Sequence, residues 1–250
     1  TRNQTSKDAF IYWSEDPVIN REIARIQPQA TLYPFGSNEQ NVAYTDGSHL
    51  VVASKPDVAP LRVPLEELSL KGKHNQLNSM AAGLAAQILN IHNDVIRESL
   101  QQFAGVDHRL QYVATVRGVR YINDSKATNV NSCWYALESM TTPTVLILGG
   151  TDKGNDYSEI DALVKEKCHT LIFMGKDNSN LVQHFEPMGI TYISTDNLQD
   201  AVQAAYHSAS DGDTVLLSPC CASFDLFKNY EHRGREFKEW VKANILTNER

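Results

Sequence analysis

The sequence is short of cysteine and lacks any long apolar run, and both shortages restrict the class of protein. Its four cysteines have spacings that match neither a zinc site nor a disulfide framework. We therefore expect reduced thiols, as in a cytoplasm, and no structural metal. No apolar run approaches the roughly 18–20 residues that span a bilayer, and the start shows no signal-peptide pattern. These absences predict a cytoplasmic protein without a membrane partner. The cysteines are Cys133, Cys168, Cys220 and Cys221.

The sequence also has no excess of basic residues over acidic ones. Thirty acidic side chains against 23 basic ones give a net charge of −7, which argues against nucleic acid as a partner. The sequence has no G-x-x-x-x-G-K-[ST] phosphate-binding loop. No histidine and acid stand beside Cys220 or Ser223, so a hydrolase triad is excluded. Local sites for small anions are compatible with all of these absences.

What is present in the first part of the chain resembles the later portion of an α/β domain. The chain begins at Thr1 rather than methionine, and we expect it to be a piece of a longer protein. Asp16 is suited to cap a helix that starts at Pro17. Apolar runs predict strands at 9–13 and 30–34, and a hairpin over 41–54 that turns at Asp46-Gly47.

Two helices are expected next, over 76–90 and 93–103. His74, Asn75 and Asn78 cluster where the first of them starts, and the two amides could face a polar ligand. The alternative is that these side chains only cap the helix, and the residues by themselves favour it. Gly105 to Arg109 is typical of a hinge, which divides the chain into domains 1–105 and 106–250.

From Leu110 onward, strands and helices alternate, which predicts a doubly wound α/β domain with a mostly parallel sheet covered on both faces. The expected strands are 111–116, 119–123, 144–149, 169–175, 191–194 and 213–218. The expected helices follow Asn129, span 158–167, 180–187 and 198–209, and run from about Ser223 into the 240s.

Three polar turns follow strands of this predicted sheet, namely 124–129, 149–154 and 217–230. The carboxyl ends of parallel strands form the crevice where such sheets bind ligands. Together the turns supply Lys126, Thr128, Lys153 and Ser223, a set suited to a small molecule that carries carboxylates. The alternative is that Asp124, Ser125 and Thr128 cap one helix and that Ser223 caps another.

The segments NDSKATN, GGTDKGND and LLSPCCASFDLFKNYEHRGREF, in this order, resemble the C-terminal domain of the Mur ligase family. LKGKHNQLN and DHRLQ resemble the end of that family's central domain and the interdomain junction. The resemblance covers residues 68–250 and, more loosely, 1–67. It implies a Rossmann-like Mur ligase C-terminal domain at 106–250, preceded by the tail of an α/β ATPase-type central domain at 1–105.

The DSKATN form resembles the family members that add D-glutamate to UDP-N-acetylmuramoyl-L-alanine in peptidoglycan precursor synthesis. The resemblance implies a monomeric ATP-dependent amide ligase that uses Mg²⁺ and an acyl-phosphate intermediate. It assigns Lys126 to the acyl-phosphate region as the catalytic residue. It assigns Asn75, Asn78, Arg109 and Asp124 to ATP, and Thr128, Lys153, Ser223, Phe224 and Tyr230 to D-glutamate.

The sequence also departs from the family's pattern. The family's phosphate-binding loop, magnesium ligands, carbamylated lysine and uridine-binding domain have no counterpart in residues 1–250, and we expect them before Thr1. The chain by itself is therefore expected to be inactive. Two rival interpretations are a stand-alone module that binds a nucleotide or an acidic amino acid without catalysis, and a folylpolyglutamate-synthase-type ligase. The second rival should differ in the NDSKATN turn.

Overall fold

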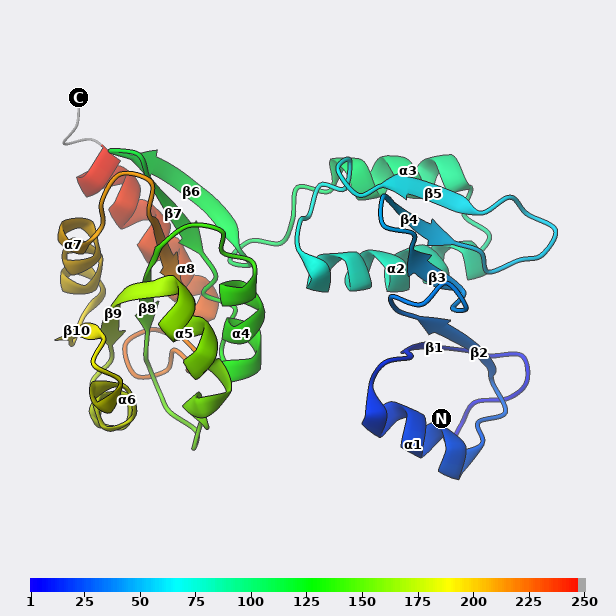
Figure 1. Ribbon diagram of the computed structural model, residues 1–250, viewed down its shortest axis with the longest axis horizontal. Coiled ribbons are helices and arrows are strands. Elements are labelled where there is room, and N and C mark those ends of the chain that lie inside the picture. The colour runs from blue at the N-terminus through cyan, green and yellow to red at the C-terminus, as the bar shows by residue number, and fades with distance from the viewer. Residues whose placement is uncertain (247–250) are drawn as a thin grey trace. The chain divides into compact units, whose positions relative to one another are not determined.

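A computed structural model describes residues 1–246 of the chain (Figure 1). The chain divides into two compact units, Thr1–Gly105 and Val106–Arg250. The first unit contains a five-stranded sheet and the second a six-stranded sheet.

The sheet of the first unit has the order β1-β2-β3-β4-β5. Its first three strands are parallel, and β3, β4 and β5 are antiparallel neighbours. The expected hairpin is confirmed, because Tyr44 on β3 pairs with Val51 on β4. Strand β5 was not predicted from the sequence; it ends at Pro64, which a strand at the sheet edge tolerates. The strands are β1 (Ala9–Trp13), β2 (Thr31–Phe35), β3 (Ala43–Thr45), β4 (His49–Val52) and β5 (Leu61–Pro64).

Three helices complete this unit: α1 (Pro17–Ile26), α2 (Lys73–Ile88) and α3 (Asn93–Gln102). The predicted cap of α1 is confirmed, because the Asp16 carboxylate accepts hydrogen bonds from the first-turn backbone N–H groups. Helix α2 starts three residues earlier than expected. Its buried Met80 and Leu84 pack into the core of this sheet. A Cβ atom on Gly83 would lie 3.1 Å from Val52, so glycine permits this close approach of helix and sheet.

The sheet of the second unit has the order β10-β9-β8-β11-β7-β6. All of its neighbouring strands are parallel except β6 and β7, which form an antiparallel hairpin. The predicted mostly parallel sheet is therefore confirmed. The strands are β6 (Gln111–Val116), β7 (Val119–Asn123), β8 (Thr144–Leu148), β9 (Cys168–Met174), β10 (Thr191–Thr195) and β11 (Thr214–Leu217).

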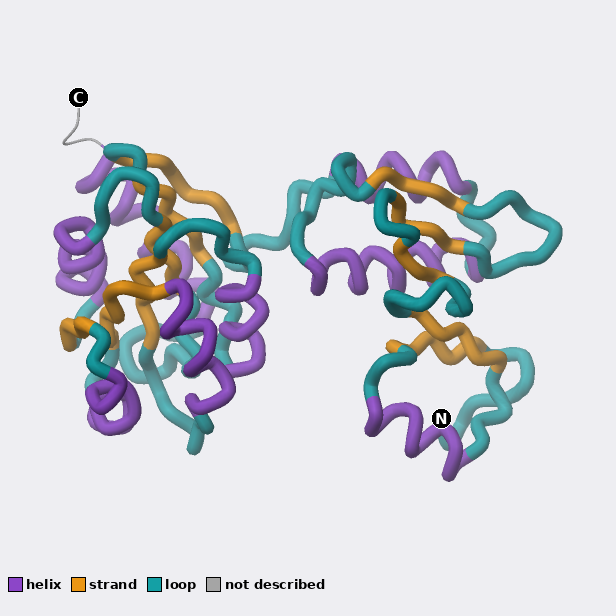
Figure 2. The backbone as a smooth tube through the Cα atoms, viewed as in Figure 1, coloured by secondary structure: helices purple, strands orange, loops and turns teal. Residues whose placement is uncertain are grey.

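Helices cover both faces of this sheet, and strand and helix alternate along the chain (Figure 2). Successive strand residues point to opposite faces, so Val145 and Ile147 pack in one core and Leu146 and Leu148 in the other. On one face lie α4 (Val130–Glu138), α5 (Asp161–Lys167) and α6 (Ser179–Phe185). On the other face lie α7 (Leu198–Ser208) and α8 (Tyr230–Trp240). The short helices are η1 (Tyr157–Ile160), η2 (Glu186–Met188) and η3 (Val241–Leu246).

The strand order brings the three polar loops together. Strands β8, β11 and β7 are parallel neighbours, so the loops that follow Leu148, Leu217 and Asn123 leave the same edge of the sheet. The expected shared edge is confirmed. The expected last helix is present through the 230s and into the 240s, but its predicted start at Ser223 is wrong. Residues 218–229 form an irregular loop, and α8 begins at Tyr230 with the Asn229 side chain as its cap.

Within residues 1–246, no helix combines the length and the apolar character that a membrane crossing requires.

The C-terminal end of α4 is held by a lysine from a different helix. The last carbonyl groups of a helix have no partner within it. The half-buried Lys167, at the end of α5, donates hydrogen bonds from Nζ to the carbonyl oxygens of Leu137, Glu138 and Met140, at 3.0, 2.8 and 2.9 Å. One ammonium group therefore joins two helices on the same face of the sheet.

We expect Lys167→Met to lower the free energy of unfolding by about 2 kcal/mol, because hydrogen bonds to a charged group each contribute about 1.5–3 kcal/mol and the three share one donor. Urea unfolding monitored by circular dichroism measures the change. Lys165→Met, at an exposed position of the same helix, is the matched control and should change stability by less than about 0.5 kcal/mol. Equal effects of the two substitutions would contradict the role given to Lys167.

Candidate functional site

The loop after β7 is fixed by backbone hydrogen bonds rather than by capping of the next helix. The Asp124 N–H donates to the Leu217 carbonyl at 2.8 Å, and the Lys126 N–H donates to the His108 carbonyl at 2.9 Å. The side chain that caps α4 belongs to Asn129, which accepts from the Ser132 N–H. The capping alternative for Asp124, Ser125 and Thr128 is therefore wrong.

Asp124 is a buried carboxyl group, with 5% of its surface exposed. Its Oδ1 accepts from the Leu110 N–H at 3.1 Å, and its Oδ2 accepts from the Ser218 hydroxyl at 2.9 Å. Burial raises the pKa of Asp124 to about 7, although these hydrogen bonds and the nearby charges of Arg109 and Arg233 act in the opposite direction. The side chain thus titrates close to neutral pH.

A buried arginine ties the loop after β7 to the loop after β11. Arg233, on α8, is fully buried. It donates from Nε to the Ser125 hydroxyl at 2.9 Å, from Nη2 to the Ser125 carbonyl at 2.9 Å, and from Nη1 to the Cys221 carbonyl at 3.2 Å. Burial lowers the pKa of Arg233 to about 10. Arg233 lies in one of the segments that carry the family resemblance, but no local pattern in the sequence marks it as a buried residue.

The Lys126 ammonium contacts Tyr230, the first residue of α8. Nζ donates to the tyrosine hydroxyl at 3.1 Å and lies 4.6 Å from the centre of its ring. Both residues are half-buried, and Thr128 lies half-buried two residues further along the same loop. The structure thus brings together two residues that the sequence assigned separately, one to catalysis and one to D-glutamate.

The loop after β8 crosses closely under the loop after β11. Gly149 and Gly150 have φ values of 126° and 128°, and the Thr151 N–H donates to the Ala222 carbonyl at 2.8 Å. A Cβ atom on Gly150 would lie 2.3 Å from the same carbonyl oxygen, so a side chain there would separate the two loops. Lys153 follows on the exposed part of this turn, and within residues 1–246 it has no hydrogen-bond or ion-pair partner.

Two consecutive residues in the loop after β11 differ strongly in how much of their surface is exposed to solvent. Ser223 has 2% of its surface exposed, whereas Phe224 has 71% exposed. The Ser223 carbonyl accepts from the Phe227 N–H at 2.8 Å, which closes a turn inside the loop. Ser223 is therefore almost fully enclosed, whereas the neighbouring Phe224 side chain faces solvent.

The remaining residues assigned to ATP differ in their solvent exposure and in whether their side chains already make hydrogen bonds. Arg109 is exposed beside Asp124 in the second unit. Asn75 and Asn78 lie on α2 in the first unit. Asn75 is buried and donates to the Lys71 carbonyl at 2.8 Å, whereas Asn78 is exposed. No side chain caps α2 at Gly72, so the capping alternative is wrong there too. Among residues 1–246, no group of three or more histidine, cysteine, aspartate or glutamate side chains could hold a metal ion.

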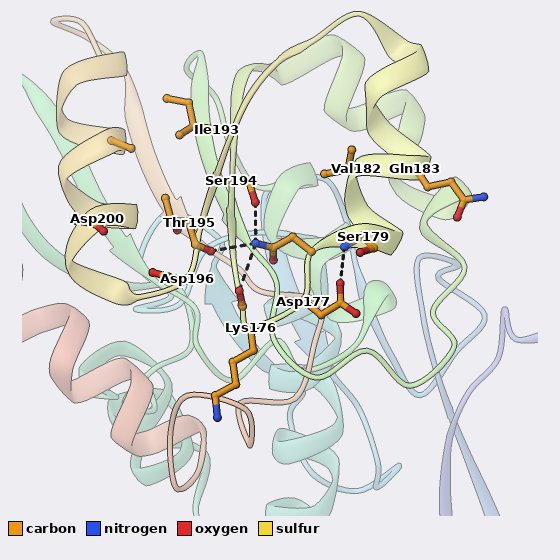
Figure 3. Close-up of a pocket in the computed structure, with 13 residues that line it drawn as sticks. Lys176, Asp177, Ser179, Val182, Gln183, Ile193, Ser194, Thr195, Asp196 and Asp200 are labelled. Atoms are coloured by element: carbon orange, nitrogen blue, oxygen red, sulfur yellow. Dashed lines mark hydrogen bonds between the residues drawn. The ribbon is translucent and has the colours of Figure 1, made fainter.

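A hollow of about 1000 Å³ lies at the ends of β9 and β10, next to these loops (Figure 3). Its lining includes three carboxylates, those of Asp177, Asp196 and Asp200, and one cation, Lys176, whose side chain extends away from the centre of the view. None of the site residues predicted from the sequence lines it. This negative lining disfavours a ligand with carboxylates, so we do not assign such a ligand to the hollow.

Comparison with known proteins relates both units to one group of enzymes. Residues 108–221 match the family model described as Mur ligase, glutamate ligase domain. The UDP-N-acetylmuramoylalanine–D-glutamate ligase of Bacteroides fragilis is 53% identical over 245 residues, which are 97% of this chain and 54% of the relative. The enzyme of the same name from Porphyromonas gingivalis is 50% identical and is covered to 54%. The chain thus spans about half the length of the curated relatives it matches.

Solved structures with low sequence identity share the fold. MurF from Acinetobacter baumannii has a TM-score of 0.67 at 14% identity, with 95% of this chain and 53% of that chain covered. The folylpolyglutamate synthase of Mycobacterium tuberculosis complexed with ADP has a TM-score of 0.69 at 13% identity, with 93% of this chain and 55% of that chain covered.

The titration of Asp124 predicts a pH-dependent contribution to stability. Its folded pKa of about 7 exceeds the ordinary value of 3.8, so the stability provided by the protonated form is complete below about pH 4 and is lost as pH rises through 7. The Asp124→Asn variant should not lose stability in this way, because its amide does not titrate. Between pH 4 and 8, the stability of the wild type relative to the variant should fall by up to about 4 kcal/mol.

Denaturant unfolding of both proteins across this pH range measures the difference. Glu166→Gln, at an exposed position of α5, is the control, and its difference from the wild type should stay flat. A flat difference for Asp124→Asn as well would contradict a pKa near neutrality.

Proposed function

We infer that this chain belongs to the Mur ligase family, because residues 108–221 match the family model described as Mur ligase, glutamate ligase domain. We propose that it is part of an ATP-dependent ligase. The ligase joins the amine of D-glutamate to the terminal carboxyl group of UDP-N-acetylmuramoyl-L-alanine. One observation carries this proposal: the 53% identity, over 97% of the chain, to a relative named as the D-glutamate ligase.

The two carboxylates of D-glutamate are assigned to the loops after β7, β8 and β11. Lys153 is an exposed cation without a partner among residues 1–246, so it is free to pair with one carboxylate together with the Thr128 hydroxyl. The Ser223 hydroxyl and the backbone near Phe224 bind the other. Two carboxylates held at separate points fix the amine between them, which orients it for attack. The common sheet edge of these three loops supports the assignment.

Lys126 is assigned to the carboxyl group that becomes activated. Its ammonium is oriented by the Tyr230 hydroxyl and ring, and a cation that is already oriented in a half-buried position stabilises negative charge as it develops. Tyr230 thus acts on the reaction by holding Lys126, in addition to its assignment to D-glutamate.

When ATP is bound, it supplies the phosphoryl group that activates the carboxyl group. Of the residues assigned to it, Arg109 and Asn78 are exposed and have free polar ends. Asp124 already accepts two hydrogen bonds and Asn75 already donates one, so these two fit a nucleotide less directly. Among residues 1–246, no group of three or more acid, histidine or cysteine side chains would hold Mg²⁺ without help from the phosphates of ATP.

A stand-alone binding module is the second candidate, favoured by the lack of a phosphate-binding loop in the 250 residues. It would bind an acidic amino acid or nucleotide without turnover. The two candidates separate in a longer protein that contains this chain, because only the ligase gains activity there.

We expect the isolated 250-residue chain to catalyse no ligation, because its sequence has no G-x-x-x-x-G-K-[ST] loop to bind the phosphates of ATP. The measurement is phosphate release with ATP, UDP-N-acetylmuramoyl-L-alanine and D-glutamate present. The control omits D-glutamate. Phosphate release by the purified chain that requires both substrates would refute this prediction.

In the full-length ligase, Lys153→Ala should raise the KM for D-glutamate about ten- to a hundredfold, because a charged hydrogen bond contributes about 1.5–3 kcal/mol and each 1.4 kcal/mol is tenfold in affinity. Ser223→Ala should raise it less, since it removes a neutral hydroxyl. Asp124→Ala should weaken ATP more than D-glutamate. Steady-state kinetics with each substrate varied in turn tests the three assignments. An unchanged KM for D-glutamate in Lys153→Ala, with weaker ATP binding, would overturn the division of the site.

A further inference from the structure

The carboxylate of Asp152, next to Lys153, is turned inward and fully hydrogen-bonded. Its Oδ1 accepts from the N–H groups of Gly154 and Asn155 at 2.8 and 2.9 Å. Its Oδ2 accepts from the Tyr157 hydroxyl at 3.0 Å and from Asn180 Nδ2 at 3.1 Å. Burial alone would raise the pKa of Asp152, but these four donors outweigh it and hold the pKa below its ordinary value. Asp152 is therefore a carboxylate at neutral pH.

The donors around Asp152 connect the loop after β8 to the loop after β11. The Tyr157 side chain is 3% exposed, and its hydroxyl lies 3.2 Å from Cys221 Sγ. Asn155 Nδ2 donates to the Cys220 carbonyl at 3.2 Å and also contacts the Tyr157 hydroxyl at 3.3 Å. The same cluster thus fixes the turn that carries Lys153 and contacts the loop after β11 at Cys220 and Cys221, shortly before Ser223.

Lys153 lies inside the turn that Asp152 closes. The backbone on its C-terminal side is held at Gly154 and Asn155, and on its N-terminal side at Asp152 itself. Its side chain remains exposed and makes no ion pair with Asp152. A neighbouring aspartate would ordinarily attract the lysine and repel an incoming carboxylate. Here the four donors take up both oxygens, so the lysine charge is left for a ligand.

We propose that Asp152 is the positioning residue for Lys153: by closing the turn and joining it to Tyr157 and Asn155, it sets where the ammonium stands relative to Ser223. This inference rests on the proposed function, in which Lys153 binds a carboxylate of D-glutamate. Asp152 contacts no substrate. It determines the affinity for the acidic amino acid by holding the span between the two carboxylate-binding groups.

The test is a double-mutant cycle in the full-length ligase, with Asp152→Ala, Lys153→Ala and the double variant. Asp152→Ala should raise the KM for D-glutamate about five- to tenfold, because it would weaken, without abolishing, the charged hydrogen bond between Lys153 and the carboxylate. The KM for ATP should stay within about twofold. In the Lys153→Ala background, Asp152→Ala should add no further increase, since coupled residues are not additive.

Two milder variants guard against simple unfolding. Asp152→Asn keeps Oδ1 as an acceptor for the turn but presents an amide to Tyr157 and Asn180, so its KM for D-glutamate should be intermediate. Tyr157→Phe removes one donor and should raise this KM about two- to threefold. Asp156→Ala is the matched control and should leave the KM unchanged, because Asp156 caps η1 by accepting from the N–H and hydroxyl of Ser158.

The outcomes separate this inference from the proposed function. If Lys153→Ala raises the KM for D-glutamate but Asp152→Ala multiplies that increase in the double variant, Asp152 stabilises the fold only and the inference is wrong. An effect of Asp152→Ala on ATP equal to that on D-glutamate overturns it as well. If Lys153→Ala itself leaves the D-glutamate KM unchanged, the carboxylate assignment fails and the inference fails with it.

Discussion

The geometry of the candidate site depends on the hydrogen bonds that the buried guanidinium of Arg233 donates. Burial of a charged group without a carboxylate partner is costly. Within residues 1–246, the three hydrogen bonds of Arg233 go instead to Ser125 and Cys221, one residue in each of two loops. Removal of the guanidinium would leave two buried carbonyl oxygens without this donor, and the two loops would lose their common anchor. A sheet edge by itself only brings loops near one another, whereas this arginine fixes the distance between them.

The parallel sheet and the polar loops play different parts in this fold. Solved structures that are only 13–14% identical to this chain share the fold. A few polar contacts then decide what the loops can bind. The glycine pair at 149–150 lets one loop pass beneath another, and the cluster around Asp152 stabilises the turn beyond it. Ligand recognition therefore depends on loop-to-loop hydrogen bonds that the sheet makes possible but does not determine.

Much of the second unit could be predicted from the sequence, because apolar alternation and turn residues report local structure. The hairpin of β6 and β7 and the shared edge of the three loops are examples. The start expected for the last helix at Ser223 failed for a physical reason: serine is a good cap, but the chain there is held instead by the long-range hydrogen bond from the Thr151 N–H to the Ala222 carbonyl. Arg233 and Asp152 were missed because a polar residue in a polar segment gives no local sign that it will be buried or enclosed. Asn75 likewise resembles a ligand-binding amide in the sequence, but its side chain donates to the Lys71 carbonyl just before its helix.

All four cysteines are buried, and all four belong to the core between α4, α5, α6 and the sheet. Because the first unit contains no cysteine, every thiol reaction of this chain takes place in the second unit. A thiol-specific reagent added to the native protein can react only when that face of the sheet opens. At low reagent concentration, the rate of labelling, measured as chromophore release from the reagent, would depend on the equilibrium constant for opening. At high concentration, the rate would reach a plateau equal to the rate constant for opening. The wild-type chain thus contains its own reporter of local unfolding beneath the candidate site, and no label has to be introduced.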